Sequence, residues 1–464
     1  MKTSHKQSGT SLPGLLSSSI SRRRFISATA AASLFQIVPR HVIGGTTQRP
    51  PSEKLNIAIV GLGVMGQLNL KACSGENIVA LCDVDHKFAA ASFKAFPEAA
   101  VYKDYRVMLE KQKDIDAVLI ATPDHTHAVI AQATMQSGKH IFCQKPLTHD
   151  VHEARVLARI AKETGVVSQM GIQGHSQEGL RLICEWIWDG AIGTVHEVDA
   201  YCSLSYAPAG HAWWSSPLTE RPAEGLPVPS TLDWDLWIGP AAMRPYHTTY
   251  HPSTWRCWWD FGCGMMGDRG AHTLDPVYSA LKLTAPTSVE ASGVVGGNDE
   301  VHPDRAVVTY HFPAREGFPP LKLNWYEGQE APRPKELEED RGMYSGGGAV
   351  FKGDKGAIIC GVYGNNPRLI PRSAMKAYER PEKTLLRIKG SHENNWIEAI
   401  KKGVRASADF DYSGPLTEVA LLGNVAKRFP GQKLLWDDKN LKVTNFDEAN
   451  AWVKRPYRDG WSLS

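Results

Sequence analysis

The sequence is poor in features that would specify a metal centre, a disulfide framework or a membrane span. Its 464 residues include only eight scattered cysteines, with no C-x-x-C pair and no metal-ligand spacing, so buried thiols and no metal site are expected. The mildly apolar stretch at 27–38 is too short for an ordinary transmembrane helix. The net charge of +3 gives no indication of a nucleic-acid partner or a membrane surface. The class that remains is a soluble globular enzyme of two or three domains.

Residues 1–43 are predicted to be a targeting segment outside the fold. The first 20 residues are rich in Ser, Gly and Lys, and Arg22-Arg23 then precedes an Ala-rich, mildly apolar stretch. This order is typical of a twin-arginine (Tat) export signal, so a periplasmic or otherwise exported protein is expected. The alternative is a basic tail on a cytoplasmic protein. Residues 44–54, which include two adjacent prolines, are expected to form a linker or an arm.

A short apolar stretch, Asn56–Val60, leads directly into a G-x-G-x-x-G pattern. A strand, a glycine turn and a helix in this order are typical of a dinucleotide-binding domain. Gly61 permits the tight turn, Gly63 lets the backbone approach a pyrophosphate, and Gly66 lets the helix pack close to the strand. The N–H groups at the helix N-terminus suit the phosphates. The loop residues expected to bind the cofactor are Gly61, Leu62, Gly63, Met65 and Gly66.

Asp83 ends the next predicted strand, residues 78–82. A carboxylate near this place accepts hydrogen bonds from the adenosine ribose hydroxyls, and it repels the 2′-phosphate of NADP. No arginine follows it in the next three residues. NAD is therefore the expected cofactor, and NADP is the less favoured alternative.

Residues 55–174 alternate short apolar runs with amphipathic helices, which is the pattern of a parallel sheet. Open parallel sheets bind ligands at the carboxyl ends of their strands. The residues expected at the nicotinamide end of the site are therefore Thr122, Pro123 and His125 after the strand 116–121, and Gln144 and Lys145 after the strand 140–143. His125 has a simpler alternative as a turn residue before the following helix.

Four features together resemble the Gfo/Idh/MocA oxidoreductase family. They are the glycine loop, the Thr-Pro pair followed by two histidines, the Lys-Pro pair at 145–146, and a D-x-G-x-H-x-x-D pattern at 268–275. The resemblance covers nearly the whole chain after residue 54. It implies an α/β Rossmann domain at 55–174 and an α+β C-terminal domain at 175–464 with an open, mainly antiparallel sheet. It also implies a homo-oligomer formed through that sheet.

In this family the Lys-Pro lysine and the Asp and His of the second pattern surround the reacting carbon, which points to Lys145, Asp268 and His272 here. A histidine of near-neutral pKa suits the acid/base step of alcohol oxidation. Lys145 suits stabilisation of the developing alkoxide. Asp268, four residues before His272 on one helix face, suits a contact to the imidazole or to a sugar hydroxyl. One departure is that Gln144 stands where the family has a glutamate.

Residues 204–260 form a long segment rich in Pro and Trp that leads into the second pattern. Loops of this length in enzymes are usually functional, so this one is interpreted as a wall of the substrate pocket. Stacking of Trp255 on a sugar ring and plain packing both stay open. Alternating runs at 288–294, 306–312 and 321–326 predict strands, and the aromatic C-terminal tail is expected to dock. The residues expected to bind substrate are Gln173, His175, Tyr246, Trp255, Arg256, Asp268 and His272.

These features predict an exported NAD(P)-dependent oxidoreductase that transfers hydride between a nicotinamide and a secondary hydroxyl of a sugar, polyol or glycoside, with C3 of a glycoside as one candidate position. A periplasm supplies little free NAD, so a tightly held cofactor is expected. Two alternatives stay open. One is an NAD-dependent glycosidase of the same fold that acts through transient oxidation. The other is a non-catalytic sensor of a sugar or a dinucleotide.

Overall fold

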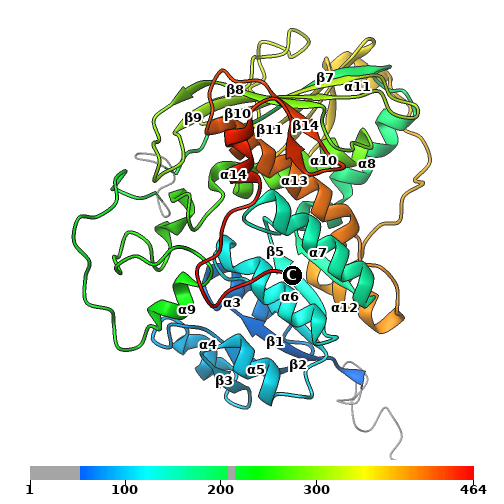
Figure 1. The fold of residues 1–464 in the computed structure, drawn as a ribbon. Coiled ribbons are helices and arrows are strands. Elements are labelled where there is room, and N and C mark those ends of the chain that lie inside the picture. The colour runs from blue at the N-terminus through cyan, green and yellow to red at the C-terminus, as the bar shows by residue number, and fades with distance from the viewer. Residues whose placement is uncertain (1–52, 207–214) are drawn as a thin grey trace, which may run out of the picture. The chain divides into compact units, whose positions relative to one another are not determined.

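The computed structural model describes residues 53–206 and 215–464. The predicted export signal, nearly all of the predicted arm, and His211–Trp214 of the long loop lie outside the described residues. Two β-sheets with their helices organise the described part (Figure 1). Within it, no helix has the length and apolar character needed to cross a bilayer. All eight cysteines are buried and free, which confirms the prediction of buried thiols.

The first sheet is parallel, with the strand order β3-β2-β1-β4-β5-β6. Helices cover both of its faces, and successive side chains of β1 alternate between two buried clusters, with Ile57 and Ile59 in one and Ala58 and Val60 in the other. This arrangement confirms the predicted Rossmann domain. The strands are β1 (Asn56–Val60), β2 (Asn77–Cys82), β3 (Ala100–Tyr102), β4 (Ala117–Ile120), β5 (His140–Gln144) and β6 (Ser168–Gly171).

A helix from far along the chain completes this domain. α12 packs beside α3 on one face of the sheet, where Trp396 contacts Phe142 of β5 with ring centroids 5.6 Å apart. α6 and α7 belong to the cluster on the other face (Figure 1). Part of the buried core on this face therefore comes from residues far along the chain. The helices are α3 (Val64–Ala72), α4 (Ala90–Ala95), α5 (Tyr105–Lys111), α6 (His127–Gln136), α7 (Val151–Thr164) and α12 (His392–Lys402).

The second sheet is mainly antiparallel, with the order β13-β12-β11-β7-β10-β9-β8-β14-β15. Among the described strands, β7 and β10 form its one parallel pair. The three strands predicted from alternating residues are present as β8, β9 and β10, which confirms the expected fold class. The strands are β7 (Val195–Cys202), β8 (Ser288–Val295), β9 (Arg305–Phe312), β10 (Leu321–Glu327), β11 (Gly348–Gly353), β12 (Gly356–Gly361), β13 (Arg368–Ile370), β14 (Leu434–Asp437) and β15 (Lys442–Val443).

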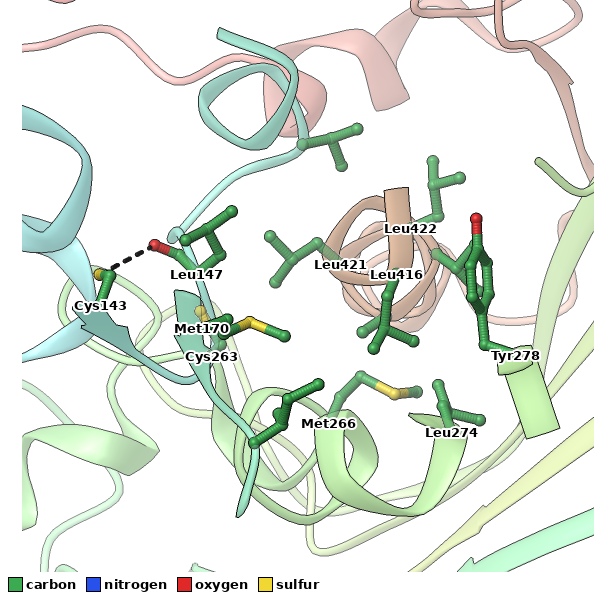
Figure 2. Packing of buried hydrophobic residues seen from close by; sticks show 14 of the residues in the cluster. Cys143, Leu147, Met170, Cys263, Met266, Leu274, Tyr278, Leu416, Leu421 and Leu422 are labelled. Carbon is green, nitrogen blue, oxygen red and sulfur yellow. Dashed lines mark hydrogen bonds between the residues drawn. The ribbon is translucent and has the colours of Figure 1, made fainter. Parts of the chain in front are cut away.

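Helix α13 joins the two domains through apolar contacts. Figure 2 shows its Leu416 and Leu421 among Met170 of β6 and Met266, which begins the turn that carries Asp268. At Gly423 of the same helix an added Cβ would clash with the side chains of Tyr310 and Met266, so glycine permits this close approach. α13 therefore supports the Asp268 turn. The remaining helices of the second domain are α8 (Glu178–Trp188), α10 (Ala271–Ala280), α11 (Arg372–Ala377), α13 (Phe410–Lys427) and α14 (Asn450–Val453).

Two further segments reach back to the first domain. The long loop forms the short helix α9 (Trp234–Ile238), and the Asp233 N–H just before it donates to the Val84 carbonyl at 2.9 Å. The C-terminal tail runs from α14 along the first domain (Figure 1) and ends with the Ser464 N–H donating to Gln132 Oε1 at 2.8 Å. The tail is docked, as the sequence predicts.

Candidate active site

The glycine loop between β1 and α3 lines a cleft. Gly61 has φ of 87°, and an added Cβ would lie 2.7 Å from the backbone of Ala121. At Gly66 an added Cβ would clash with the Gly61 carbonyl oxygen. At Gly63 φ is −67°, and an added Cβ would meet Phe88 alone among the described residues, at 3.6 Å. The fold therefore requires glycine at 61 and 66, whereas at 63 there is open space for a ligand beside a helix N-terminus.

This contrast predicts different outcomes for two alanine substitutions. Gly63→Ala is expected to change Tm by no more than about 2 °C, because its backbone conformation suits alanine. It is expected to weaken NAD binding roughly ten-fold or more, because the methyl group occupies space that a pyrophosphate needs. Gly66→Ala is the control, for which the backbone clash should lower Tm. Calorimetric titration and thermal unfolding measure both, and unchanged NAD affinity in Gly63→Ala would contradict this role.

Asp83 lies at the end of β2 and is held by backbone groups. Its Oδ2 accepts the Leu62 N–H at 2.7 Å, and its Oδ1 accepts the Asp85 N–H at 2.8 Å. Burial raises the pKa of the Asp83 carboxyl, and the two N–H groups oppose that rise because they stabilise the charge. Each carboxylate oxygen keeps a further lone pair, and Asp83 lines the cleft. The side chain is therefore suited to accept the ribose hydroxyls of an adenosine.

The other end of the cleft lies at the carboxyl ends of β4 and β5. The predicted cofactor residues that line the cleft are Gly61, Gly63, Met65, Asp83, Thr122, Pro123, Gln144 and Lys145. Leu62, Gly66 and His125 are outside the lining. His127 braces this end, with ring nitrogens 2.8 Å from the Pro146 carbonyl oxygen and 3.0 Å from the Thr122 carbonyl oxygen.

His125 is a buried contact between the first domain and the long loop. Its ring nitrogens lie 3.2 Å from the Phe261 carbonyl oxygen and 2.9 Å from the Trp237 carbonyl oxygen. Burial lowers the pKa of His125 to about 4, although the two carbonyl groups act in the opposite direction. This placement agrees with the simpler alternative of a structural residue in the turn before α6.

Gln144 is held by a chain of side-chain hydrogen bonds. Its Nε2 donates to Asn69 Oδ1 at 2.9 Å, and Asn69 Nδ2 donates to Glu393 Oε1 at 2.7 Å. An ionised carboxylate only accepts hydrogen bonds, so Asn69 must turn its nitrogen to Glu393 and its oxygen to residue 144. Residue 144 must then be a donor, which a glutamine provides and an ionised glutamate does not. The departure from the family's glutamate is thus matched to Glu393 on α12.

The direction of this chain can be tested by exchanging amide and carboxylate. Gln144→Glu is expected to lower Tm by several degrees, because Asn69 would face carboxylates on both sides. Combining it with Glu393→Gln should restore Tm, because Asn69 can then donate to the carboxylate at position 144 and accept from the amide at position 393. Glu393→Gln alone keeps the original direction and serves as the control. A coupling energy of about 1–2 kcal/mol in a double-mutant cycle is expected, and additive effects would rule the chain out.

The cleft meets the second domain at an ion pair between Lys145 and Asp268. The other oxygen of Asp268 accepts the hydroxyl of Tyr206. Burial alone would raise the pKa of Asp268, but the charges of Lys145 and Arg256 outweigh it and hold this pKa well below its ordinary value. The carboxylate therefore stays ionised at neutral pH and is a poor proton acceptor.

Asp268 is presented by a π-helical turn, Met266–Gly270, that runs directly into α10. Widened turns of this kind are frequent at functional sites. At Gly267 an added Cβ would clash with Cys263 and lie 3.1 Å from Pro146, so glycine lets the turn approach the Lys-Pro pair. The sequence suggested one regular helix face for this pattern, whereas the turn before α10 is wider.

His272 lies at the start of α10, only 3% exposed and outside the cleft lining. Its ring packs edge-on against Tyr363, with centroids 4.7 Å apart. Burial and the charge of Lys145 hold the pKa of His272 well below its ordinary value, so the expectation of a near-neutral pKa is corrected. Its Nδ1 is buried without a hydrogen-bond partner among the described residues. Such a nitrogen is uncommon in a folded protein and is consistent with a role in proton transfer.

Two predicted substrate residues of the long loop line the cleft. These are Trp255 and Arg256, whose guanidinium carbon lies 4.2 Å from the Trp255 ring centroid. They offer an apolar face and several hydrogen-bond donors next to Asp268. Tyr246 is placed elsewhere, edge-on against Trp234 at 5.2 Å, in the aromatic core of the loop.

Gln173 and His175 also lie outside the cleft lining. His175 Nδ1 is 2.8 Å from Asp275 Oδ1, and the Tyr412 hydroxyl donates to the same oxygen at 2.6 Å. Asp275 is the last residue of the second pattern. These contacts link the turn after β6 to α10 and α13, which points to a structural task.

Several aromatic side chains of the site were missed by sequence reasoning, among them Tyr206, Trp237 and Trp461. Tyr206 contacts Asp268, while Trp237 and Trp461 line the cleft. The abundance of tryptophan in the long loop was a signal for Trp237. For Trp461 the aromatic tail predicted docking but not its place, and nothing in the pattern around Tyr206 indicated a contact to Asp268.

Comparison with known protein families matches two regions of the chain. Residues 55–172 match the Gfo/Idh/MocA description "Oxidoreductase family, NAD-binding Rossmann fold". Residues 204–313 match the companion description "Oxidoreductase family, C-terminal alpha/beta domain". The first match agrees with the glycine loop and Asp83, and the second includes Asp268 and His272.

Curated relatives match mainly over a limited stretch. A levoglucosan dehydrogenase of Pseudarthrobacter phenanthrenivorans is 27% identical over 154 residues, which cover 31% of this chain and 39% of that protein. An inositol 2-dehydrogenase of Rhizobium meliloti is 31% identical over 147 residues, which cover 31% of this chain and 44% of that protein. The chain thus matches about two fifths of the length of these relatives.

Solved structures share the fold over most of the chain. The WlbA dehydrogenase from Bordetella pertussis in complex with NADH and UDP-GlcNAcA has a TM-score of 0.58 and 17% identity, covering 83% of this chain and 99% of that chain. A levoglucosan dehydrogenase in complex with NADH and levoglucosan has a TM-score of 0.55 and 17% identity, covering 81% of this chain and 97% of that chain. Likeness at this level of identity establishes the fold class predicted from the sequence.

Proposed function

The two domains of this chain belong to the Gfo/Idh/MocA oxidoreductase family with its NAD-binding Rossmann fold, and from this premise we propose an NAD-dependent oxidoreductase that acts on a secondary hydroxyl of a sugar, polyol or glycoside. The observation that carries the proposal is the ion pair between Lys145 and Asp268. It joins the end of the cofactor cleft to the second-domain turn, where a substrate alcohol can reach both. Relatives named as dehydrogenases of levoglucosan and inositol support this substrate class.

The residues of the cleft fit a dinucleotide. Space at Gly63 beside the N-terminus of α3 suits a pyrophosphate, and the acceptor oxygens of Asp83 suit a ribose. Thr122 and Pro123 at the end of β4 suit the nicotinamide half. When bound, a nicotinamide supplies the acceptor for the hydride that leaves the substrate carbon.

The proton of the substrate hydroxyl must be accepted by a side chain of the protein. Lys145 is placed to hydrogen-bond the substrate oxygen and to stabilise the negative charge that develops on it. Asp268 orients Lys145 through the ion pair and, with its low pKa, does not take up the proton itself. Neutral His272, whose Nδ1 is buried without a hydrogen-bond partner among the described residues, is the proposed acceptor of that proton. Trp255 and Arg256 are proposed to hold the sugar ring and its other hydroxyls.

The direct test is to purify the protein and measure NAD(H) released on denaturation, then to screen sugars, polyols and glycosides. Stoichiometric formation of NADH with one of them is the expected result. Release of aglycone without net NADH would instead favour the glycosidase alternative. Sugar binding without any turnover would favour the sensor and contradict the proposal.

Export through the Tat route with the cofactor already bound is a further part of the proposal. It is supported by Arg22-Arg23 before a mildly apolar segment and by a Rossmann domain able to fold around its ligand before transport. Replacement of both arginines by lysine is expected to retain the full-length protein in the cytoplasm, as measured by cell fractionation. Unchanged distribution between the compartments would exclude this route.

A homo-oligomer formed through the second sheet is also proposed. α10 and α13 pack against this sheet, and its strands also carry a charged ladder in which Glu197 lies 3.7 Å from Lys322 and 2.7 Å from Lys352. Complementary charges of this kind suit a self-complementary contact. Sedimentation velocity should detect a dimer or larger, and a monomer at micromolar concentration would contradict it.

A further inference from the structure

The C-terminal tail, residues 454–464, brings Trp461 into the lining of the cofactor cleft. The tail is anchored to the turn after α9 by the Arg458 side chain. Its guanidinium donates to the Gly239 carbonyl at 2.6 Å and to the Asp235 carboxylate and carbonyl at 2.9 Å each. The path of the tail is therefore set on both sides of Trp461, by Arg458 and by the Ser464 contact to Gln132.

The neighbours of Trp461 show at which end of the cleft it lies. The guanidinium carbon of Arg106 is 5.0 Å from the Trp461 ring centroid and 5.8 Å from that of Tyr105. Tyr105 lines the cleft just after β3, and β3 pairs with β2, whose end carries Asp83. Asp83 marks the adenosine half and Lys145 the nicotinamide half, so Trp461 belongs to the adenosine half.

The guanidinium carbons of Arg106 and Arg458 both lie over the Trp461 indole, 5.0 Å and 5.8 Å from the centroid of its ring. Arg106 is fixed by its own carboxylate partner, with Nε and Nη2 donating to Asp104 at 2.7–3.1 Å. An added Cβ at Gly239 would lie 3.9 Å from the edge of the Trp461 ring, so the turn after α9 passes close to it. A planar apolar ring held in this way at the adenosine end suits the flat face of a purine.

We propose that Trp461 is part of the adenine site and that the C-terminal tail covers the adenosine half of the bound cofactor. This inference takes from the proposed function only the identity of the ligand as NAD. Purines stack on aromatic side chains, and a tryptophan offers the largest face. A tail in this position slows release of the cofactor without contacting the reacting carbon.

The test compares three ligands: NADH, ADP-ribose, which lacks the nicotinamide, and reduced nicotinamide mononucleotide, which lacks the adenosine. Trp461→Ala is expected to weaken the binding of NADH and of ADP-ribose roughly ten-fold each, because both ligands lose the stacking contact. Its affinity for the mononucleotide should stay within two-fold, roughly the scatter of unrelated surface changes. Trp461→Phe should restore most of the affinity for the first two. Stopped-flow displacement should show the loss as faster dissociation of NADH.

Trp452→Ala is the matched control, because Trp452 lies in the preceding helix, α14, and outside the cleft lining. The guanidinium carbon of Arg428 lies 3.8 Å from the centroid of its ring. It should leave all three affinities unchanged. The proposal is overturned if Trp461→Ala binds ADP-ribose as the wild type does, or if it weakens the mononucleotide equally. Should that variant be unstable, Trp461→Leu keeps apolar bulk without the aromatic face and must give the same selective loss. Failure of the wild type to bind any of the ligands would instead reject the proposed function itself.

Discussion

Lys145→Met is expected to lower kcat about 10³-fold while NAD affinity stays within a few-fold of the wild type. Methionine keeps the unbranched apolar part of the side chain and removes the terminal ammonium group, with its charge and its hydrogen-bond donors. The developing alkoxide then loses its one cationic partner at the end of β5, whereas the pyrophosphate and ribose contacts at Gly63 and Asp83 stay intact. The measurements are steady-state turnover of the substrate found by screening and calorimetric titration with NAD.

The same substitution is expected to destabilise the protein, and this effect must be separated from the loss of turnover. Removing one partner of a buried ion pair costs about 3–5 kcal/mol, because the other charge is left without compensation. Here Asp268 would keep its contact to Tyr206 and the fields of Arg256 and Arg269. Its pKa would rise, and it would take up a proton at a higher pH than in the wild type.

Lys145→Met combined with Asp268→Asn isolates the catalytic effect. The neutral pair removes the uncompensated charge, so Tm should recover most of the loss, while turnover should stay near the level of the single variant. Recovery of both Tm and turnover would mean that Lys145 acts only by holding Asp268 in place. Turnover by Lys145→Met within ten-fold of the wild type would reject its assignment as the group that stabilises the alkoxide.

The parts of this molecule that sequence could predict depend on short-range patterns. The glycine loop needs a positive φ at Gly61 and a close approach at Gly66, and only glycine satisfies both, so its spacing alone identifies the turn. The convergence of Lys145 and Asp268 was predictable from the family resemblance. The two-residue alternation of β8, β9 and β10 likewise follows from having one buried face.

The parts that were missed depend on long-range docking. His125 and Thr122 follow the same strand, but His125 points to carbonyl groups of the long loop while Thr122 lines the cleft. No local pattern distinguishes these two directions. Trp461 reaches the cleft because Arg458 pairs with the turn after α9, far away in the sequence. Similarly, Gln144 is explained only once Glu393 on α12 is known to lie behind Asn69.

Stability is expected to fall as the pH drops below about 6.5, because the pKa values of six histidines are lowered in the folded state. Burial is the first cause of a lowered pKa in each of His125, His127, His149, His272, His302 and His392. Below the pKa of a histidine in the unfolded chain, the unfolded state binds more protons than the folded state. Each proton of this difference lowers the free energy of unfolding by about 1.4 kcal/mol per pH unit.

The magnitude is large enough to unfold the protein under mildly acidic conditions. For His125 and His392 the folded pKa is about 4, so each contributes a loss of about 3 kcal/mol by the time the pH reaches 4. Together these two residues lower the free energy of unfolding by about 6 kcal/mol, which is comparable to the whole free energy of unfolding of many domains, about 5–15 kcal/mol. Glu153 acts in the opposite direction, because burial raises its pKa to about 8 and the folded state holds that proton while the unfolded state releases it. Asp83, Asp124, Asp150 and Glu418, whose pKa values burial also raises, act in the same direction as Glu153.

Urea unfolding measured between pH 8 and pH 5 checks this expectation, and its slope counts the protons taken up on unfolding. His125→Gln should reduce that slope by about one proton, whatever it does to stability at pH 7, because glutamine does not titrate. His196→Gln, on the exposed side of β7, is the matched control. A free energy of unfolding that stays constant from pH 7 to pH 5, together with an unchanged slope in His125→Gln, would contradict the expected proton uptake by these histidines on unfolding.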